Sequence, residues 1–294
     1  MPVGQFRFVC WVACLAVLAA GRQAQAETSR PLAWHDDYPA AIQSAKEQGK
    51  LLLVHFYDPD RPDLVEQFAE HSLNKPEVQK SLLRFERVRV PLDTKIVVDG
   101  QEQTVLKRSG YREMLGRAGI AIVDFKYAGA RHYRQVVSTF PFPAGKYYGP
   151  RTMQNVLTLP AGSLTQRTII FAVRQHPEAP ASTRGTLHPA LSHEAESHSR
   201  HQAQIHVQGH HSWETRFHRI NARVGEGALA TEVVAESWPG ENLVEAAIEC
   251  VHSWRQSPGH WSAVRSRHRF FAFDMKRGSN GIWYATGLFA NRRR

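Results

Sequence analysis

The chain has 294 residues, of which 42% are hydrophobic and 22% are charged; this balance excludes a disordered chain and suits about two globular domains. Three cysteines in a chain of this length exclude a small scaffold held together by disulfides. The formal net charge of +10, counted without sixteen histidines, predicts attraction to anionic molecules or surfaces.

The first 26 residues have the pattern of a secretory signal peptide. Arg7 provides a positive start, residues 8–20 form an apolar run, and an Ala-Gln-Ala cleavage site ends at Ala26. The apolar run is shorter than the ~20 residues that a membrane-spanning helix needs. We therefore expect cleavage after Ala26, a secreted or periplasmic protein, and no transmembrane span in the remaining chain.

Cleavage at this point would change the cysteine chemistry. It would remove Cys10 and Cys14, leaving Cys250 as the one thiol of the mature chain. A single thiol cannot form an intrachain disulfide, so the exported chain would depend on packing for its stability. Cys250 lies on the apolar face of an expected helix, where a buried structural thiol is the default interpretation.

Helical and strand patterns alternate between residues 34 and 175. A helix is expected over 34–48, with Gly49 as its C-terminal stop, and a buried strand over 51–57. Other expected elements are an interrupted helical segment at 64–83, strands at 85–90, 120–125 and 131–138, and a short helix at 153–159. Strands separated by helices predict an α/β layer fold.

The composition changes after residue 175. Residues 176–186 have the Pro, Ala and Ser content of a linker, and we place the boundary between two domains there. Apolar residues at helical spacing predict a long helix from 187 to 205 and a second helix over 243–254. Alternating residues around a Gly-Ser-Asn-Gly turn predict a closing β-hairpin over 271–289.

The first domain, residues 27–175, resembles the thioredoxin superfamily. The resemblance lies in the order of its elements and in the apolar run 52–57, which a turn and a helix follow. Arg61 and Leu64 stand where the family has its Cys-x-x-Cys pair, and no proline stands near Gly119, where the family has a cis-proline. Without thiolates disulfide exchange is impossible, so the resemblance implies a scaffold without redox activity.

The second domain, residues 187–294, resembles the CAP superfamily of cysteine-rich secretory proteins, antigen 5 and pathogenesis-related 1, in its bacterial, SCP-like form. Four segments in the family's order carry the resemblance: Gly209-His210-His211, Gly240-Glu241-Asn242-Leu243, Ser257-Pro258-Gly259-His260-Trp261 and the aromatic strand 282–286. The resemblance implies an α-β-α sandwich and, with the first domain, an α/β protein throughout.

The CAP resemblance also implies a cleft with histidines and acidic partners. By motif match its residues are His211, with His210 as the alternative, Glu241 and His260. Neutral His211 and His260 could hold zinc or another divalent metal, and a carboxylate could orient one ring. The same residues are candidates for catalysis, with Glu241 or a histidine as general base. No acid stands at 254–257, where the family often has a second glutamate.

A structural interpretation of these residues stays open. Glu241 could accept backbone N–H bonds at a helix start, and His260 could be a buried, hydrogen-bonded side chain. Nine of the sixteen histidines fall between residues 176 and 218, and pairs at helical spacing could chelate a metal or simply form a polar helix face.

A basic patch precedes the final hairpin. Its members are Arg265, Arg267, His268 and Arg269, of which the three arginines are the expected contacts, and on an exported protein such a patch would meet anionic lipids or envelope polymers before nucleic acid. The neighbouring aromatic residues follow core periodicity, which disfavours nucleic-acid binding.

Three functions follow from these patterns. The first is an exported binding protein whose His/Glu cleft takes a metal, a lipid or a peptide. The second is a metal-assisted hydrolase that uses the same cleft. The third is a structural envelope protein that binds an anionic polymer or a membrane through the basic patch. The sequence favours a binding protein over an enzyme.

Overall fold

The computed structural model describes residues 32–225 and 227–292. The expected signal peptide, with Cys10 and Cys14, lies outside these residues. Trp34–Arg294 group into one unit by their contacts, and both sheets described below belong to it. Within the described part of the chain, no helix is long and apolar enough to cross a membrane.

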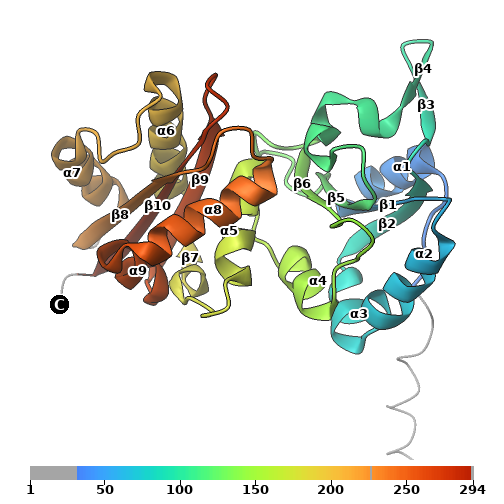
Figure 1. The fold of residues 1–294 in the computed structure, drawn as a ribbon, viewed down its shortest axis with the longest axis horizontal. Helices are drawn as coiled ribbons and strands as arrows, with labels where there is room; N and C mark the ends of the chain where they lie inside the picture. The colour runs from blue at the N-terminus through green and yellow to red at the C-terminus, as the bar shows by residue number, and fades with distance from the viewer. Residues whose placement is uncertain (1–31, 226, 293–294) are drawn as a thin grey trace, which may run out of the picture. The chain divides into compact units, whose positions relative to one another are not determined.

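The first sheet has four strands in the order β2-β1-β5-β6 (Figure 1). β1 (Leu51–Tyr57) runs parallel to β2 (Phe85–Pro91) and antiparallel to β5 (Gly119–Asp124). β6 (Val136–Pro141) lies antiparallel to β5 at the edge. All four strands were expected, but β6 begins later than residue 131, because residues 131–135 form a turn in which the Gln135 amide donates to the His132 carbonyl.

The helices around this sheet begin where the local sequence favours a start. The Asp37 side chain caps α1 (Tyr38–Gln48), and Gly49 ends it in the left-handed conformation, as expected. Proline is the first residue of three further helices, where its missing N–H costs nothing. These are α2 (Pro62–Phe68), α3 (Pro76–Leu82) and α4 (Pro150–Leu157), with a π-helical turn at Ala69–Leu73.

Small elements join β2 to β5. β3 (Lys95–Val98) and β4 (Gln101–Thr104) form a separate two-stranded hairpin, and two 3₁₀ segments follow it at Val105–Lys107 and Ser109–Met114. These segments pack with α1 over one face of the sheet, where Tyr38, Phe56 and Tyr111 belong to a common apolar core. The sequence patterns did not reveal this covering layer.

Helix α5 (Leu164–Gln175) packs against elements of both sheets and was not expected. A capping box between Ser163 and Gln166 begins it. On one side it contacts β6 and α4, and on the other it contacts β9 and α8. Its Arg167 is buried and donates hydrogen bonds to Ser138 Oγ and to two backbone carbonyl groups.

The segment 176–186 lies against the second half of the chain. The Ala181 amide donates to the Arg265 carbonyl, and a 3₁₀ turn at Ser182–Arg184 leads into the short strand β7 (Thr186–Leu187). β7 pairs in parallel with β9. The segment is therefore fixed by hydrogen bonds, and the domain boundary placed within it stays a prediction.

The second sheet has the order β7-β9-β10-β8 and carries helices on both faces. α6 (Pro189–Ile205) and α7 (Trp213–Val224) share one apolar core with the sheet. α8 (Leu243–Gln256) and α9 (Pro258–Arg265) contact β8, and α5 contacts β9. The remaining strands are β8 (Ala228–Glu236), β9 (Phe270–Arg277) and β10 (Trp283–Arg292).

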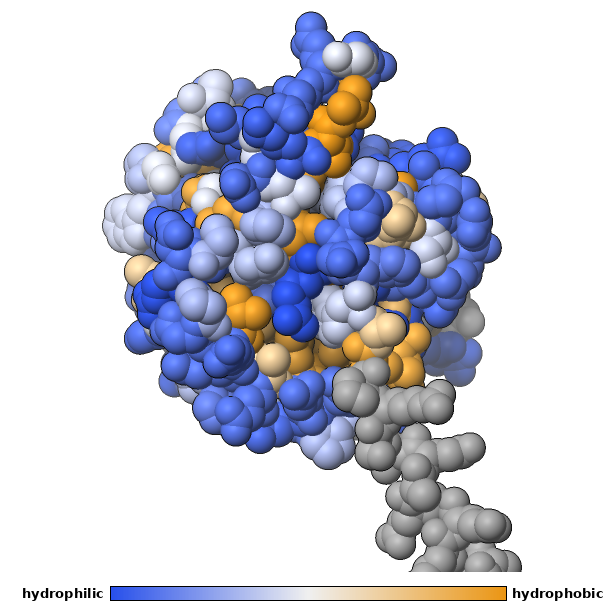
Figure 2. Space-filling view, turned by 90° about the vertical axis from the view of Figure 1, so that its right-hand side faces the viewer, coloured by the Kyte–Doolittle hydropathy of each residue, from blue (hydrophilic) through white to orange (hydrophobic). Residues whose placement is uncertain are grey.

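The expected helices α6 and α8 and the closing hairpin β9–β10 are confirmed, and so is the α/β fold class. α7, β8 and α9 were not expected. Cys250 is buried on α8, as the helical spacing predicted. The face drawn in Figure 2 is mostly hydrophilic and carries hydrophobic residues in small groups. The largest fully buried apolar side chains of the described residues include Trp254, Phe56 and Phe273.

Candidate functional site

A buried carboxylate lies at the centre of the histidine-rich region. Glu232 is on β8, and its side chain is 1% exposed. Arg216 of α7 donates one hydrogen bond to each of the two carboxylate oxygens, which is the bidentate geometry that guanidinium and carboxylate groups favour. His210 Nδ1 lies 3.0 Å from Glu232 Oε1 and is a further hydrogen-bond partner of this carboxylate. A carboxylate held in this way fixes the orientation of the His210 ring.

The ring of His210 directs its second nitrogen at His260. When Nδ1 donates its hydrogen to Glu232, Nε2 is left with a free lone pair. This Nε2 lies 3.4 Å from Nε2 of His260, and the two ring centroids are 5.6 Å apart. Pro258 begins α9 and so places His260 in its first turn. Two imidazole nitrogens thus converge from different elements.

The structure decides between the two adjacent histidines. His211 turns away from His260, and its Nε2 lies 3.1 Å from the Val207 carbonyl oxygen. Its ring stands 5.5 Å from that of His201 on α6. The left-handed conformation of Ser212, with φ of 50°, sets the chain direction after this pair. His210, the alternative in the motif match, is therefore the residue that meets His260.

Glu241 makes different contacts from those expected of a cleft acid. Its Oε2 accepts the Trp238 amide at 3.1 Å, and its carbonyl accepts the indole N–H of Trp283. Among the described residues, none of its hydrogen bonds or ion pairs involves a histidine. The helix-start role also belongs elsewhere, because the neighbouring Asn242 side chain accepts the amides of Val244 and Glu245 and caps α8.

The environment sets the protonation of the cluster. Burial alone would raise the pKa of Glu232, but hydrogen bonds from His210 and Arg216 and nearby positive charge bring it below its ordinary value. Burial lowers the pKa of His198, which lies 3.6 Å from Glu232, to about 4. Burial and the neighbouring His210 also lower the pKa of His260. Near pH 7 an ionised carboxylate therefore faces neutral His198 and His260.

The His210–His260 spacing fits two ligands of one tetrahedral metal ion. Nitrogens bound to zinc at about 2.0–2.1 Å lie about 3.3–3.4 Å apart when the bond angle is tetrahedral. The carboxylate behind His210 is the usual second partner of a metal-binding imidazole. Within residues 32–225 and 227–292, however, no three His, Cys, Asp or Glu side chains converge on one point. Any metal held here would keep open positions.

The positions matched to the thioredoxin thiols line a cavity in the first half of the chain. Arg61 and Leu64 lie at the start of α2, beside a cavity of about 290 Å³. Arg61 forms a two-pronged ion pair with Asp63. His55 of β1 also lines this cavity and is surrounded by aromatic rings, with Phe68 at 5.0 Å. Burial and nearby Arg89 lower the pKa of His55 to about 3, which keeps it neutral.

Comparison with known proteins adds little to this geometry. No family model matches the chain. No curated protein matches it. Among solved structures, the chain is similar to a thioredoxin from Thermus thermophilus at 23% sequence identity. The similarity covers 26% of this chain and 73% of that one, with a TM-score of 0.20.

The sequence patterns missed the two residues that organise the cluster, Glu232 and Arg216. Glu232 interrupts the series of buried apolar residues at alternate positions of β8, namely Ala228, Ala230 and Val234. An acid at an inward position of a strand is unusual unless it is paired. That interruption was the available signal. The pairing of Glu232 with Arg216 could not be predicted from the sequence, because Arg216 lies on a different element, α7.

The three arginines of the basic patch are exposed, whereas His268 between them is buried. Arg265 ends α9, where a positive charge suits the helix dipole, and Arg267 follows in the connection to β9. Arg269 stacks on the ring of Phe270 at 4.9 Å. All three side chains can thus be reached from solvent, and the patch stays a predicted site for an anionic partner.

Proposed function

We propose that this chain is an exported binding protein whose ligand site is the His210–His260 pair. The observation that carries the proposal is the 3.4 Å approach of the two Nε2 atoms, with His210 held from behind by Glu232. Fixed imidazole nitrogens that meet at a partly exposed position favour binding of a metal ion or of an acidic group on a ligand.

The ion pair between Glu232 and Arg216 favours binding over catalysis. The carboxylate is buried and bound by a guanidinium group as well as by His210, so it is poorly placed to accept a proton from a substrate. Its role in the proposal is to orient His210. The contacts of Glu241 with Trp238 and Trp283 leave it without a part in this site.

The CAP-like interpretation of the second half agrees with a zinc site. His210 and His260 would hold the ion, and their spacing fits this role. A bound divalent ion would supply a Lewis acid with open positions for an anionic ligand group. The protein side chains would fix the two imidazoles and, through Glu232, the tautomer of His210.

The first half serves as a thioredoxin-like scaffold in this proposal. Its sheet places β1 and β2 in parallel and closes with an antiparallel pair, an arrangement that fits the resemblance. Among the described residues the one cysteine is Cys250, which is buried on α8. Thiol chemistry at Arg61 and Leu64 is therefore not part of the proposed function.

Metal analysis of the purified protein tests the proposal. We expect one zinc ion per chain, lost in both His210→Ala and His260→Ala. His211→Ala is the matched control, since its ring points to the Val207 carbonyl, and it should keep its zinc. Urea unfolding of each variant establishes that loss of metal is not loss of fold. A chain without zinc, or loss of zinc in all three variants alike, would contradict the proposal.

Export is tested separately. The full-length chain produced in a secreting bacterial host should appear outside the cytoplasm with Glu27 at its N-terminus, as mass spectrometry of the intact protein would show. Ala24→Arg and Ala26→Arg should block processing at the Ala-Gln-Ala site. An unprocessed cytoplasmic product of the wild-type chain would overturn the assignment of export but not the proposed ligand site.

A further inference from the structure

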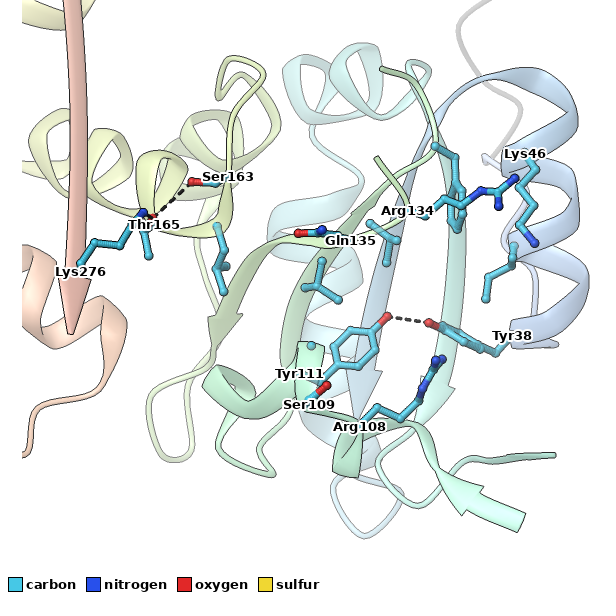
Figure 3. Close-up of a pocket in the computed structure, with 16 residues that line it drawn as sticks. Tyr38, Lys46, Arg108, Ser109, Tyr111, Arg134, Gln135, Ser163, Thr165 and Lys276 are labelled. Carbon is cyan, nitrogen blue, oxygen red and sulfur yellow. Dashed lines mark hydrogen bonds between the residues drawn. The ribbon is translucent and has the colours of Figure 1, made fainter. Parts of the chain in front are cut away.

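A cavity of about 760 Å³ lies beside α1, far along the chain from the histidine cluster. Its walls come from α1, the 3₁₀ segment at Ser109–Met114, the start of β6 and the N-terminal turn of α5 (Figure 3). This volume lies within the range of small-molecule sites. Neither the sequence patterns nor the proposed function assigns it a role.

The charged groups around this cavity are all positive. Lys46, Arg108 and Arg134 line it together with Lys276, and no aspartate or glutamate does. Lys276 is neutralised by Asp274 at 2.8 Å. Within the described part of the chain, none of the other three forms an ion pair. Arg134 and Lys46 both line the cavity (Figure 3), so an anion bound there would be attracted to both.

Two buried tyrosines provide a hydrogen-bond donor at the same place. Tyr38 and Tyr111 are each 3% exposed, and their hydroxyl oxygens lie 2.6 Å apart. Burial raises the pKa of both, so each keeps its hydrogen at neutral pH. One hydrogen serves the bond between them. The other has no acceptor among the described residues, and Arg108 lies beside the pair in Figure 3.

Part of the cavity wall is apolar. It consists of the side chains of Ile42, Val123, Phe125, Val136 and Leu164. An inorganic anion would leave this surface in contact with water, whereas a ligand with an apolar body would cover it. The N-terminal end of α5, with Ser163 and Thr165, lines the end of the cavity that lies away from Lys46 and Arg134 in Figure 3.

We propose that this cavity binds a small amphiphilic organic anion. Its acidic group, a sulfonate, phosphate or carboxylate, lies among Lys46, Arg108 and Arg134 and accepts the free tyrosine hydrogen. Its apolar body covers the wall formed by Ile42, Val136 and their neighbours. This site is independent of the His210–His260 pair, so each can fail without the other.

Fluorescence titration of the full chain with anilinonaphthalene sulfonate tests the proposal, since this dye combines a sulfonate with an aromatic body. We expect saturable binding that weakens at least about tenfold in the Arg108→Gln/Arg134→Gln double variant, in line with the loss of charge-assisted hydrogen bonds. Tyr111→Phe should weaken it by a smaller factor. His210→Ala should leave it unchanged.

Three controls separate the cavity from general effects. Arg265→Gln/Arg267→Gln removes the same charge from the exposed patch and should leave dye binding unchanged. Phenylnaphthylamine, the uncharged relative of the dye, should bind more weakly, and equimolar inorganic phosphate should not displace the dye. Equal binding of the uncharged dye, displacement by phosphate, or an equal loss in both double variants would overturn the proposal.

Discussion

Two buried histidines, one in the first sheet and one on the helix α6 that packs on the second sheet, are held in opposite ways. His55 of β1 is enclosed by the rings of Trp34, Tyr57, Phe68 and Phe142, and its Nδ1 has no hydrogen-bond partner among the described residues. His198 of α6 is equally buried, but its Nε2 lies 3.0 Å from the Gly209 carbonyl oxygen and near the Glu232 carboxylate.

This difference shows what each region can do. An aromatic enclosure keeps His55 neutral and gives it no partner with which to exchange a proton. The cluster around Glu232 instead connects side chains of α6, α7, α9 and the loop before α7, and it directs one nitrogen of His210 outward. The first sheet buries its histidine as a packing group, and the second uses a buried charge to position one.

The largest effect should follow from removing that charge. Glu232→Ala leaves the buried Arg216 without its carboxylate, and we expect a loss of about 3–5 kcal/mol in the free energy of unfolding. Urea denaturation measures it. Glu194→Ala is the matched control, since its partners Arg219 and Arg223 are half-exposed and can turn to solvent. Equal losses in the two variants would contradict the central role of Glu232.

The second effect concerns pH and the enclosed histidine. The unfolded chain binds a proton at His55 below its ordinary pKa of 6.5, whereas the folded chain does not until about pH 3. The contribution of His55 to stability is therefore fully present above pH 6.5 and declines as the pH falls. Between pH 7 and pH 5 we expect a loss of about 2 kcal/mol from this residue alone.

His55→Phe isolates this contribution. The variant keeps an aromatic ring in the enclosure but cannot take up a proton, so its unfolding free energy should fall less between pH 7 and pH 5, by about 2 kcal/mol. His198, whose pKa is about 4, will retain some pH dependence in both proteins. Identical pH profiles for wild type and variant would mean that His55 is protonated in the folded state.

The smallest effect tests whether the two regions unfold together. Ser163→Ala removes the cap of α5, which should cost about 1 kcal/mol, while Ser163→Thr should restore most of it. Because α5 contacts both sheets, we expect one transition shifted as a whole. Hydrogen exchange read separately in β1 and β10 checks this. A change confined to one strand would separate the two regions.

Much of the fold was predictable because local chemistry coincides with the tertiary structure. Three elements follow from local sequence alone. The left-handed Gly49 ends α1, a run of apolar residues forms β1, and apolar residues at helical spacing before Trp254 form α8. α5 escaped prediction for the opposite reason. Its buried Arg167 looks like a solvent-facing residue until Ser138 and the carbonyl groups of Leu159 and Pro160 accept its hydrogens.

The candidate site was predictable only as a set of histidines. Motif order singled out His260 and the adjacent pair at 210 and 211, but two neighbouring loop residues point apart, and chain direction after α6 decides between them. That direction depends on left-handed residues at His206 and Ser212, which the sequence does not mark with glycine. Glu232 needed a partner 16 positions away to make its burial possible.

The shared helix α5 also determines how the gene could be divided. A fragment that begins after residue 186 would lack the helix that packs on β9 and α8, and apolar side chains of both would face water. A fragment that ends before residue 164 would likewise uncover β6. A usable half must therefore carry residues 163–175, whichever side of the chain it comes from. If both fragments contained residues 163–175, the complex that they form would have two copies of α5. Only one copy could occupy the position between β6 and β9, so the two copies would compete for it.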